Sequence, residues 1–205
     1  GIPLPGVEIK IGAEDEILVK YGGVMKGYYK NEEETAKVFT EDGYFRTGDA
    51  GRIDENGNLY IVDRIKDLMK TSNGKYIAPQ TIEIPLQSHP EISQAMVIAE
   101  GKPYVSAVIV PDFETLIEKY QEFKNYVSLT IEEKKKLLKS PIIKEKFEKI
   151  VADIQKEFAS YEKIKKFKLL PEEFTIEKGE ITPTLKIKRR VVLEKLNSLI
   201  EGMYA

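Results

Sequence analysis

The pattern of turns and apolar residues changes near residue 63, and this change most constrains the fold. Before it, short β-branched runs are separated by the tight-turn dipeptides Asp42-Gly43 and Asn56-Gly57, which favour hairpins. After it, longer runs with helical and strand-like patterns follow one another. The sequence therefore predicts an α+β chain in two parts: a short β-barrel-like subdomain at residues 1–63 and a small second domain at residues 64–205.

The second part has the pattern of a small three-stranded sheet flanked by helices. Apolar β-rich runs at residues 92–99 and 104–110 are joined through a Gly-Lys-Pro turn, and a third strand is predicted at residues 165–170. A helix is expected from residue 80, and Pro85 should interrupt or kink it. A closing helix is expected at residues 191–203.

A helical insert is predicted between the second and third of these strands. Asp112 can cap its first helix, Thr130 begins a capping-box pattern, and Ser140-Pro141 starts a third helix. Apolar residues recur along that third helix at spacings of three and four: Ile143, Phe147, Ile150, Val151, Ile154, Phe158 and Tyr161. We interpret this stripe as core or interface. A membrane-binding face is the alternative, but acids and lysines are mixed on the opposite side.

Composition excludes several classes of function. The chain has 205 residues, no cysteine, one histidine (His89) and a formal net charge of -2. Disulfides, thiolate catalysis, Ser-His-Asp triads and His-rich metal sites are therefore excluded, and neither a metal site nor a nucleic-acid partner is expected. No apolar run approaches the roughly 20 residues needed to cross a bilayer, and a cytoplasmic location is expected. The first residues run straight into strand-like sequence, so the chain reads as a piece of a longer one.

Two polar positions in the first part are suited to bind a sugar or a phosphate. In Thr47-Gly48-Asp49, glycine permits a close backbone approach, and the carboxylate can accept two hydrogen bonds from a diol. Arg64 offers a planar fork of donors suited to ribose or phosphate oxygens. Taken alone, these residues are better explained as a structural turn aspartate and a surface ion pair.

Two further motifs lie in the second part. Residues 73–79 read as a turn before a helix, in which Gly74 can adopt a positive φ and let a ligand pass close to the backbone. Residues 182–190 form a basic run before the closing helix. Taken alone, the first could be a plain turn and the second a solvated face or a generic anion patch.

In this order and at this spacing, the four motifs resemble the C-terminal third of the AMP-forming acyl-CoA synthetases, members of the adenylate-forming ligase superfamily. The resemblance covers essentially the whole chain. The segment Asn-Gly-Lys-Tyr-Ile-Ala-Pro at residues 73–79 is similar to the long-chain fatty acid–CoA ligase branch. The resemblance implies that residues 1–63 are the last β-rich subdomain of a large adenylation region and that residues 64–205 are a mobile lid.

The resemblance also implies roles for four residues around the junction of the two parts. Asp49 would hold the ribose hydroxyls of ATP, and Ile61 and Arg64 would contact the nucleotide. Lys66 would stand at the hinge, where an exposed charged side chain costs little to move.

In the lid, the resemblance implies that Gly74 and Lys75 line the tunnel for CoA and that Glu83 is the acid ending the same motif. Lys186 matches the catalytic lysine, whose ammonium would neutralise the repulsion between the substrate carboxylate and the α-phosphate of ATP. Most of the family has glycine before this lysine, and this chain has Leu185.

The reaction implied for the full-length enzyme converts a fatty acid, ATP and CoA to acyl-CoA, AMP and pyrophosphate through an acyl-adenylate. Mg²⁺ would accompany ATP and be bound mainly by a preceding N-terminal adenylation region, since this chain has no phosphate loop or acyl pocket. The isolated chain is expected to be inactive, and peripheral membrane association of the full-length enzyme is left open. Two alternatives remain: another adenylate-forming ligase, for an aryl or short-chain acid, and a non-catalytic module that binds anions through residues 186–190 and the helical insert.

Overall fold

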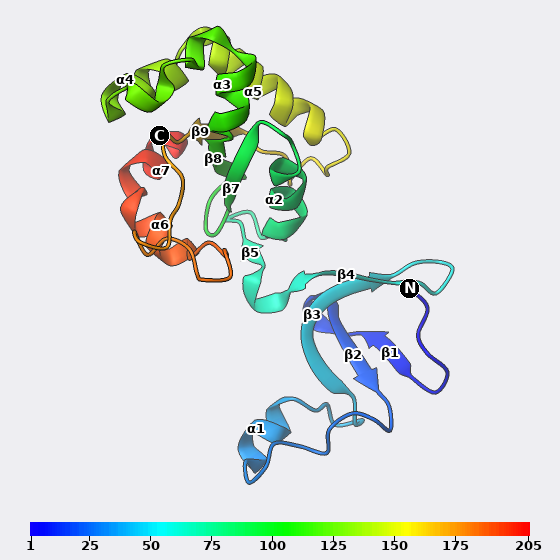
Figure 1. Ribbon diagram of the computed structural model, residues 1–205. Helices are drawn as coiled ribbons and strands as arrows, with labels where there is room; N and C mark the ends of the chain where they lie inside the picture. Colours follow the sequence, from blue (N-terminus) through cyan, green and yellow to red (C-terminus); the bar gives the residue numbers. More distant parts are fainter. The chain divides into compact units, whose positions relative to one another are not determined.

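The computed structural model describes residues 1–205 and has the predicted α+β composition (Figure 1). Contacts divide the chain into two compact units, Gly1–Leu68 and Met69–Ala205. Each unit has a sheet of its own. The chain leaves the first unit through a short 3-10 turn at Ile65–Asp67.

The first unit is built on a four-stranded antiparallel sheet in the order β1-β2-β3-β4. Its strands are β1 (Glu8–Ile11), β2 (Glu16–Lys20), β3 (Phe45–Ile53) and β4 (Leu59–Arg64), with a 3-10 turn at Ala13–Asp15 and helix α1 at Glu32–Lys37. Figure 1 shows the sheet curled as a half-barrel, which confirms the β-barrel-like prediction.

A bulge between Ala50 and Gly51 bends β3 against β4. A Cβ atom at Gly51 would lie 2.5 Å from the carbonyl oxygen of Tyr60 and 2.6 Å from Cδ1 of Ile17. Only glycine therefore allows this close approach of the strands. The bulge shifts the register so that Asp49 lies opposite Arg64.

The second unit is centred on a three-stranded sheet in the order β7-β8-β9, as predicted. Strand β7 (Ile92–Ile98) pairs antiparallel with β8 (Ser106–Pro111), and β9 (Lys166–Leu169) lies parallel to β8. A parallel neighbour requires a long crossover. The helical insert provides this connection. A two-stranded hairpin of β5 (Met69–Lys70) and β6 (Tyr76–Ile77) precedes the sheet.

Apolar side chains cover both faces of this sheet, so every residue of β8 is buried. One face packs on helix α2 and the insert, and its strand residues include Ala95, Val97 and Ile109. The other packs on the closing helices, and its strand residues include Met96 and Val108. Figure 1 shows α2 on one side of the sheet and α6 with α7 on the other.

The helices of the second unit follow the predicted order and differ from the predictions in detail. They are α2 (Pro79–Gln87), α3 (Phe113–Lys119), α4 (Ile131–Leu138), α5 (Pro141–Ile154), α6 (Arg189–Lys195) and α7 (Asn197–Tyr204), with 3-10 turns at Gln121–Phe123 and Tyr126–Ser128. Pro85 does not interrupt α2, in which Ile82 and Leu86 are buried in the core on either side of it. The closing helix is broken at Leu196, and Val192 and Ile200 reach the same core from the two halves.

The caps and the apolar stripe of the insert behave as predicted, except at the end of the stripe. Asp112 accepts a hydrogen bond from the backbone of Thr115, and Thr130 forms a complete capping box. Helix α5 ends at Ile154, so Phe158 and Tyr161 lie beyond it. Four stripe residues are buried in the core, which confirms the core interpretation: Ile143, Phe147, Ile150 and Val151. No helix in the structure combines the length and the apolar character that crossing a bilayer requires.

Adjacent isoleucines on α5 test this packing. Ile143 is 2% exposed and Ile142 is 65% exposed. Changing Ile143 to Ala should lower the free energy of unfolding by about 2–5 kcal/mol, because it leaves a cavity in the core. Changing Ile142 to Ala should alter it by less than about 0.5 kcal/mol. Urea denaturation followed by circular dichroism measures both, and equal effects would contradict the packing described.

Candidate functional site

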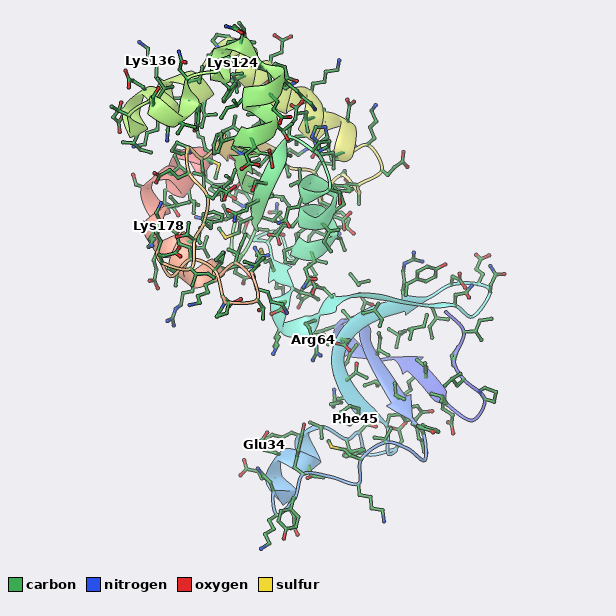
Figure 2. All side chains as sticks on the ribbon, in the orientation of Figure 1. Glu34, Phe45, Arg64, Lys124, Lys136 and Lys178 are labelled. Carbon is green, nitrogen blue, oxygen red and sulfur yellow. The ribbon has the colours of Figure 1, made fainter.

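The register of β3 and β4 brings Asp49 and Arg64 together. The two residues are directly paired, and Nε of Arg64 lies 2.8 Å from Oδ1 of Asp49. The Asp49 side chain is 29% exposed and that of Arg64 is 57% exposed, so both can be reached from solvent. Arg64 lies where β4 ends and the connection to the second unit begins (Figure 2).

A second carboxylate holds the turn that presents Asp49. Gly48 adopts φ +71°, and its N–H donates to Oε1 of Glu16 at 3.2 Å. The other carboxylate oxygen of Glu16 pairs with Arg46 at 2.9 Å. The hydroxyl of Thr47 accepts from the backbone N–H of Asp49 at 3.1 Å. Sequence reasoning missed Glu16, although an acid placed at the start of an apolar strand was a usable signal.

The other two predicted residues of this region are exposed. Ile61 lies in β4 opposite Gly51, and its side chain is 69% exposed. Lys66 lies in the 3-10 turn, which is closed by bonds from the N–H of Leu68 to the carbonyl oxygens of Arg64 and Ile65. The Lys66 side chain is exposed.

The turn at Gly74 joins β5 to β6 and is held from two sides. Gly74 adopts φ +77°, as predicted, and nothing lies near the position of a Cβ atom. Thr71 accepts from the N–H of Lys75 through its hydroxyl at 3.0 Å, and the amide of Asn73 donates to the carbonyl of Pro103 at 3.0 Å. The exposed ammonium of Lys75 lies 5.6 Å from the ring centroid of Tyr161.

Lys186 lies in a small hairpin between β9 and α6. Ile181 and Ile187 form an isolated antiparallel bridge at its base. Within it, the N–H of Thr182 donates to the carbonyl of Lys186 at 2.8 Å, and the hydroxyl of Thr182 accepts from the N–H of Lys186 at 3.0 Å. The Lys186 side chain is exposed, and its ammonium makes no ion pair within the chain.

Leu185 takes the backbone conformation that normally favours glycine. It has φ +61°, and its side chain is 72% exposed. The left-handed region costs a residue with a Cβ atom about 1–2 kcal/mol. Leucine can therefore occupy this position of the turn. The hydrogen bonds between Thr182 and Lys186 offset the conformational cost.

Arg189, three residues after Lys186, turns inward to a buried carboxylate. Its guanidinium donates to Oε1 and Oε2 of Glu83 at 2.7 and 2.6 Å and to the carbonyl of Val97 at 3.0 Å. The N–H of Val97 donates to Oε1 of Glu83 at 2.7 Å. Sequence reasoning assigned Glu83 to the CoA motif and missed Arg189 as its partner; an acid between the buried residues Ile82 and Leu86 was the available signal.

A second buried carboxylate joins the insert to the sheet. Glu91, 5% exposed, accepts from the hydroxyl of Tyr120 at 2.8 Å and pairs with Lys146 at 3.0 Å. Burial opposes its ionisation, but these hydrogen bonds and the nearby ammonium hold the pKa of Glu91 below its usual value. This cluster anchors α3 and α5 and includes no residue of the four motifs. No group of three or more His, Asp or Glu side chains in the chain is arranged to hold a metal ion.

Each unit contains one arrangement of side chains that could bind a polar or charged ligand. In the first unit, a half-exposed carboxylate and an arginine can share hydrogen bonds with a polar ligand. In the second, the exposed ammonium of Lys186, which makes no ion pair, lies on a hydrogen-bonded hairpin and can meet an anion.

A family model described as the AMP-binding enzyme C-terminal domain matches residues 66–205, which is more than half of the chain. The chain belongs to this family. The resemblance drawn from the four motifs is thereby confirmed. Lys66, Gly74, Lys75 and Lys186 all lie within the matched AMP-binding C-terminal domain, and Asp49 precedes it.

Curated relatives of this AMP-binding C-terminal domain protein extend the match to the whole chain. The long-chain-fatty-acid–CoA ligase FadD15 of Mycobacterium tuberculosis is 39% identical over 204 residues, which cover 100% of this chain and 33% of that protein. The human long-chain-fatty-acid–CoA ligase 1 is 35% identical over 196 residues, covering 94% of this chain and 27% of the ligase. The chain thus spans about a third of the length of the curated relatives it matches.

Solved structures show the same fold. The adenylation domain of a carboxylate reductase from Mycobacterium chelonae matches 98% of this chain with a TM-score of 0.70 and 26% identity, over 31% of that domain's chain. The A domain of a carboxylic acid reductase from Segniliparus rugosus, solved with AMP and a co-purified carboxylic acid, matches 98% with a TM-score of 0.68 and 27% identity, over 32% of its chain. The predicted fold class is therefore confirmed.

The pair of Glu83 and Arg189 should be a large contributor to the stability of the second unit. Changing Glu83 to Gln leaves a guanidinium that is only 29% exposed without its counter-ion, so unfolding should become easier by about 3 kcal/mol. The control is Glu194 changed to Gln, since Glu194 is exposed and only 3.8 Å from Arg190; its effect should be under about 0.5 kcal/mol. Chemical denaturation compares the two, and a loss no larger at Glu83 than at Glu194 would contradict this assignment.

Proposed function

We propose that this chain is the C-terminal portion of a long-chain fatty acid–CoA ligase. The full-length enzyme would join a fatty acid to CoA with conversion of ATP to AMP and pyrophosphate. The observation that carries the proposal is the match of the entire chain, at 39% identity, to a curated ligase of that name. The exposed ammonium of Lys186 and the paired Asp49 and Arg64 are consistent with it.

In the first unit, the proposed ligand is the nucleotide. The carboxylate of Asp49 would accept hydrogen bonds from both ribose hydroxyls, using lone pairs that its single contact with Arg64 leaves available. Arg64 would contact the nucleotide while keeping the orientation that this pair gives it. Ile61, an exposed apolar side chain on the same strand, would pack beside the nucleotide.

In the second unit, Lys186 would act as the catalytic residue of adenylation. A carboxylate and a triphosphate repel each other, and a compact ammonium between them lowers that repulsion and stabilises charge developing at the α-phosphate. The lack of any internal ion pair supports this role, because the ammonium need not break a contact before it meets the substrates. Gly74 and Lys75 would line the passage for CoA, where an open glycine leaves space beside the backbone.

Lys66 would be the hinge between the two parts of the chain. Its exposed side chain lies in a short 3-10 turn close to the point where contacts divide the chain, after Leu68. We assign residues 1–63 to the last β-rich subdomain of the adenylation region and residues 64–205 to a mobile lid. Rotation about Lys66 would withdraw Lys186 after adenylation and present the Gly74 turn for thioester formation.

The partners of the chain follow from the same proposal. The required partner is an N-terminal adenylation region, which would supply the acyl pocket and the phosphate loop. Mg²⁺ would be bound with ATP mainly by that region, since this chain gathers no three acidic or histidine side chains that fit it. We place the enzyme in the cytoplasm, with peripheral contact to a membrane as the route to its fatty acid.

Changing Lys186 to Ala in the full-length enzyme should affect one half-reaction. Fatty-acid-dependent exchange of pyrophosphate into ATP should fall by roughly 10²–10³-fold, the usual effect of removing one group that stabilises transition-state charge. Thioester formation from supplied acyl-adenylate should change by less than about threefold, because the lysine does not act in that step. Radiolabelled pyrophosphate exchange and a thioester assay measure the two.

The control is Lys136 changed to Ala, which removes an exposed lysine of the insert (Figure 2). It should leave both half-reactions unchanged. Equal loss of the two half-reactions in the Lys186 variant would contradict the role proposed for that residue. Failure of the unaltered full-length enzyme to use any fatty acid would contradict the proposed function itself.

Changing Lys66 to Pro should have the opposite effect. Proline fixes φ and restricts the residue before it, so the turn could not take a second conformation. Adenylation should persist, while thioester formation should fall by about tenfold or more. Lys66 changed to Ala keeps backbone freedom and should stay within about threefold of the original rate. An overall rate that proline leaves unchanged would exclude the hinge role.

A further inference from the structure

The segment that carries Lys186 has little regular structure of its own. It runs from the end of β9 at Leu169 to the start of α6 at Arg189. A connection of this length without helices or strands is usually either mobile or functional. Here side-chain hydrogen bonds hold it at several points, and their positions show how the lysine is presented.

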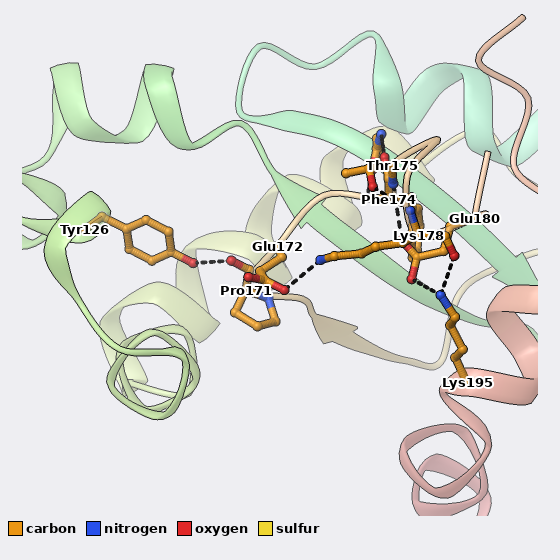
Figure 3. Close-up of polar contacts among 9 residues, drawn as sticks. Tyr126, Pro171, Glu172, Phe174, Thr175, Lys178, Glu180 and Lys195 are labelled. Carbon is orange, nitrogen blue, oxygen red and sulfur yellow. Dashed lines mark hydrogen bonds and ion pairs between the residues drawn. The ribbon is translucent and has the colours of Figure 1, made fainter. Parts of the chain in front are cut away.

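The first part of the segment is tied to β7 and to the insert. The side-chain amide of Gln94 accepts from the N–H of Phe174 at 2.7 Å and donates to the carbonyl of the same residue at 3.1 Å. The hydroxyl of Tyr126 donates to the carbonyl of Pro171 at 2.9 Å (Figure 3). These bonds fix the segment before it reaches the hairpin.

Glu180 is the residue just before the hairpin, and three contacts hold it in place. Its largely buried carboxylate, 12% exposed, accepts from Nζ of Lys195 at 3.1 Å and from the N–H of Thr175 at 3.2 Å. Lys195 also donates to the carbonyl of Lys178 at 2.6 Å (Figure 3). The carbonyl of Glu180 accepts from the N–H of Lys188 at 2.7 Å, which closes the base of the hairpin. Glu180 thus joins the incoming chain, the outgoing chain and helix α6.

The other end of the hairpin is held by the pair of Arg189 and Glu83. Two charged residues, Glu180 and Arg189, therefore flank the hairpin, and each is paired to a different helix, α6 or α2. Leu185 keeps a left-handed backbone between them. A leucine stays in that strained conformation when the hydrogen bonds around it hold the backbone in place. The hairpin is thus braced at both ends.

We propose that Glu180, through its pair with Lys195, is a positioning residue that holds the Lys186 hairpin as a rigid arm. This inference rests on the proposed function of Lys186. Glu180 would act only through the hairpin backbone and would touch no substrate. A rigid arm places the ammonium within reach of the reacting groups without ordering a loop at each turnover, and misplacement by about 1 Å can cost 10²-fold in rate.

The same segment offers a matched control. Lys178 and Glu172 form a second pair at 2.8 Å, also drawn in Figure 3, but their side chains are 43% and 53% exposed. The carboxylate of Glu172 holds Lys178 alone and makes no bond to residues 180–188. Glu172 changed to Gln therefore removes the same charge from the same segment as Glu180 changed to Gln, without touching the hairpin.

The experiment uses the full-length enzyme with Glu180 changed to Gln. Glutamine has an NH₂ group in place of one carboxylate oxygen. This donor would face the ammonium of Lys195 or the N–H of Thr175, which are also donors, so one of the two contacts would be lost. We expect the kcat of pyrophosphate exchange to fall by roughly 10–100-fold, the KM for ATP to change by less than about threefold, and thioester formation from acyl-adenylate to stay unchanged. Glu172 changed to Gln should leave all three values as they were.

Amide hydrogen exchange gives a second readout that does not depend on activity. In the same full-length variants, the N–H groups of Lys186 and Lys188 should exchange faster with Gln at position 180 and at the original rate with Gln at position 172. If Glu180 changed to Gln does not fold, Lys195 changed to Met removes the ammonium and keeps the bond to Thr175. It should show the same selective loss of adenylation, to a smaller extent.

Three results would overturn the proposal: an unchanged kcat with glutamine at position 180, equal loss in both half-reactions, or unchanged amide exchange. These differ from failure of the proposed function, in which the unaltered enzyme itself shows no fatty-acid-dependent exchange. In that case faster amide exchange with glutamine at position 180 would still establish the braced hairpin, and an unchanged rate would reject it.

Discussion

The pair between Glu83 and Arg189 is the contact that links the two segments of the second unit in which the motifs lie. Burying two charges is costly, and the cost is offset here because both carboxylate oxygens meet the guanidinium and Val97 adds two backbone bonds. The pair joins α2, which follows the Gly74 turn, to α6, which follows the Lys186 hairpin. Both motifs of the second unit are thus connected to one strand of the central sheet, β7.

The basic run at residues 186–190 contains cations with opposite tasks. Arg189 turns inward and is committed to Glu83, whereas Lys186 is exposed and carries no internal partner. The planar guanidinium suits a fixed contact with both carboxylate oxygens, and the compact, flexible ammonium suits the catalytic role proposed for Lys186. Under that proposal the basic run has one structural cation and one catalytic cation, and Glu180 fixes the base of the hairpin that carries the second.

Local chemistry predicted most of the elements. Asp112 and Thr130 cap helices as expected, and the Asn56-Gly57 turn joins β3 to β4, because caps and tight turns depend on a few neighbouring residues. The errors lie where packing overrides local preference. Helix α5 stops before Phe158, which packs on the core from outside the helix, and the closing helix is broken at Leu196.

The sequence by itself determined the family and the α+β class, since the four motifs, which are ambiguous one by one, are specific in their joint order and spacing. Only the tertiary structure decided which side chains meet. The bulge at Gly51 aligns Asp49 with Arg64, and Glu83 pairs with Arg189 from 106 positions away. Glu180 and Glu172 look alike in the sequence, yet one braces the hairpin and the other is exposed. Strand register and long-range contacts depend on the packing of the whole unit, so no local pattern encodes them.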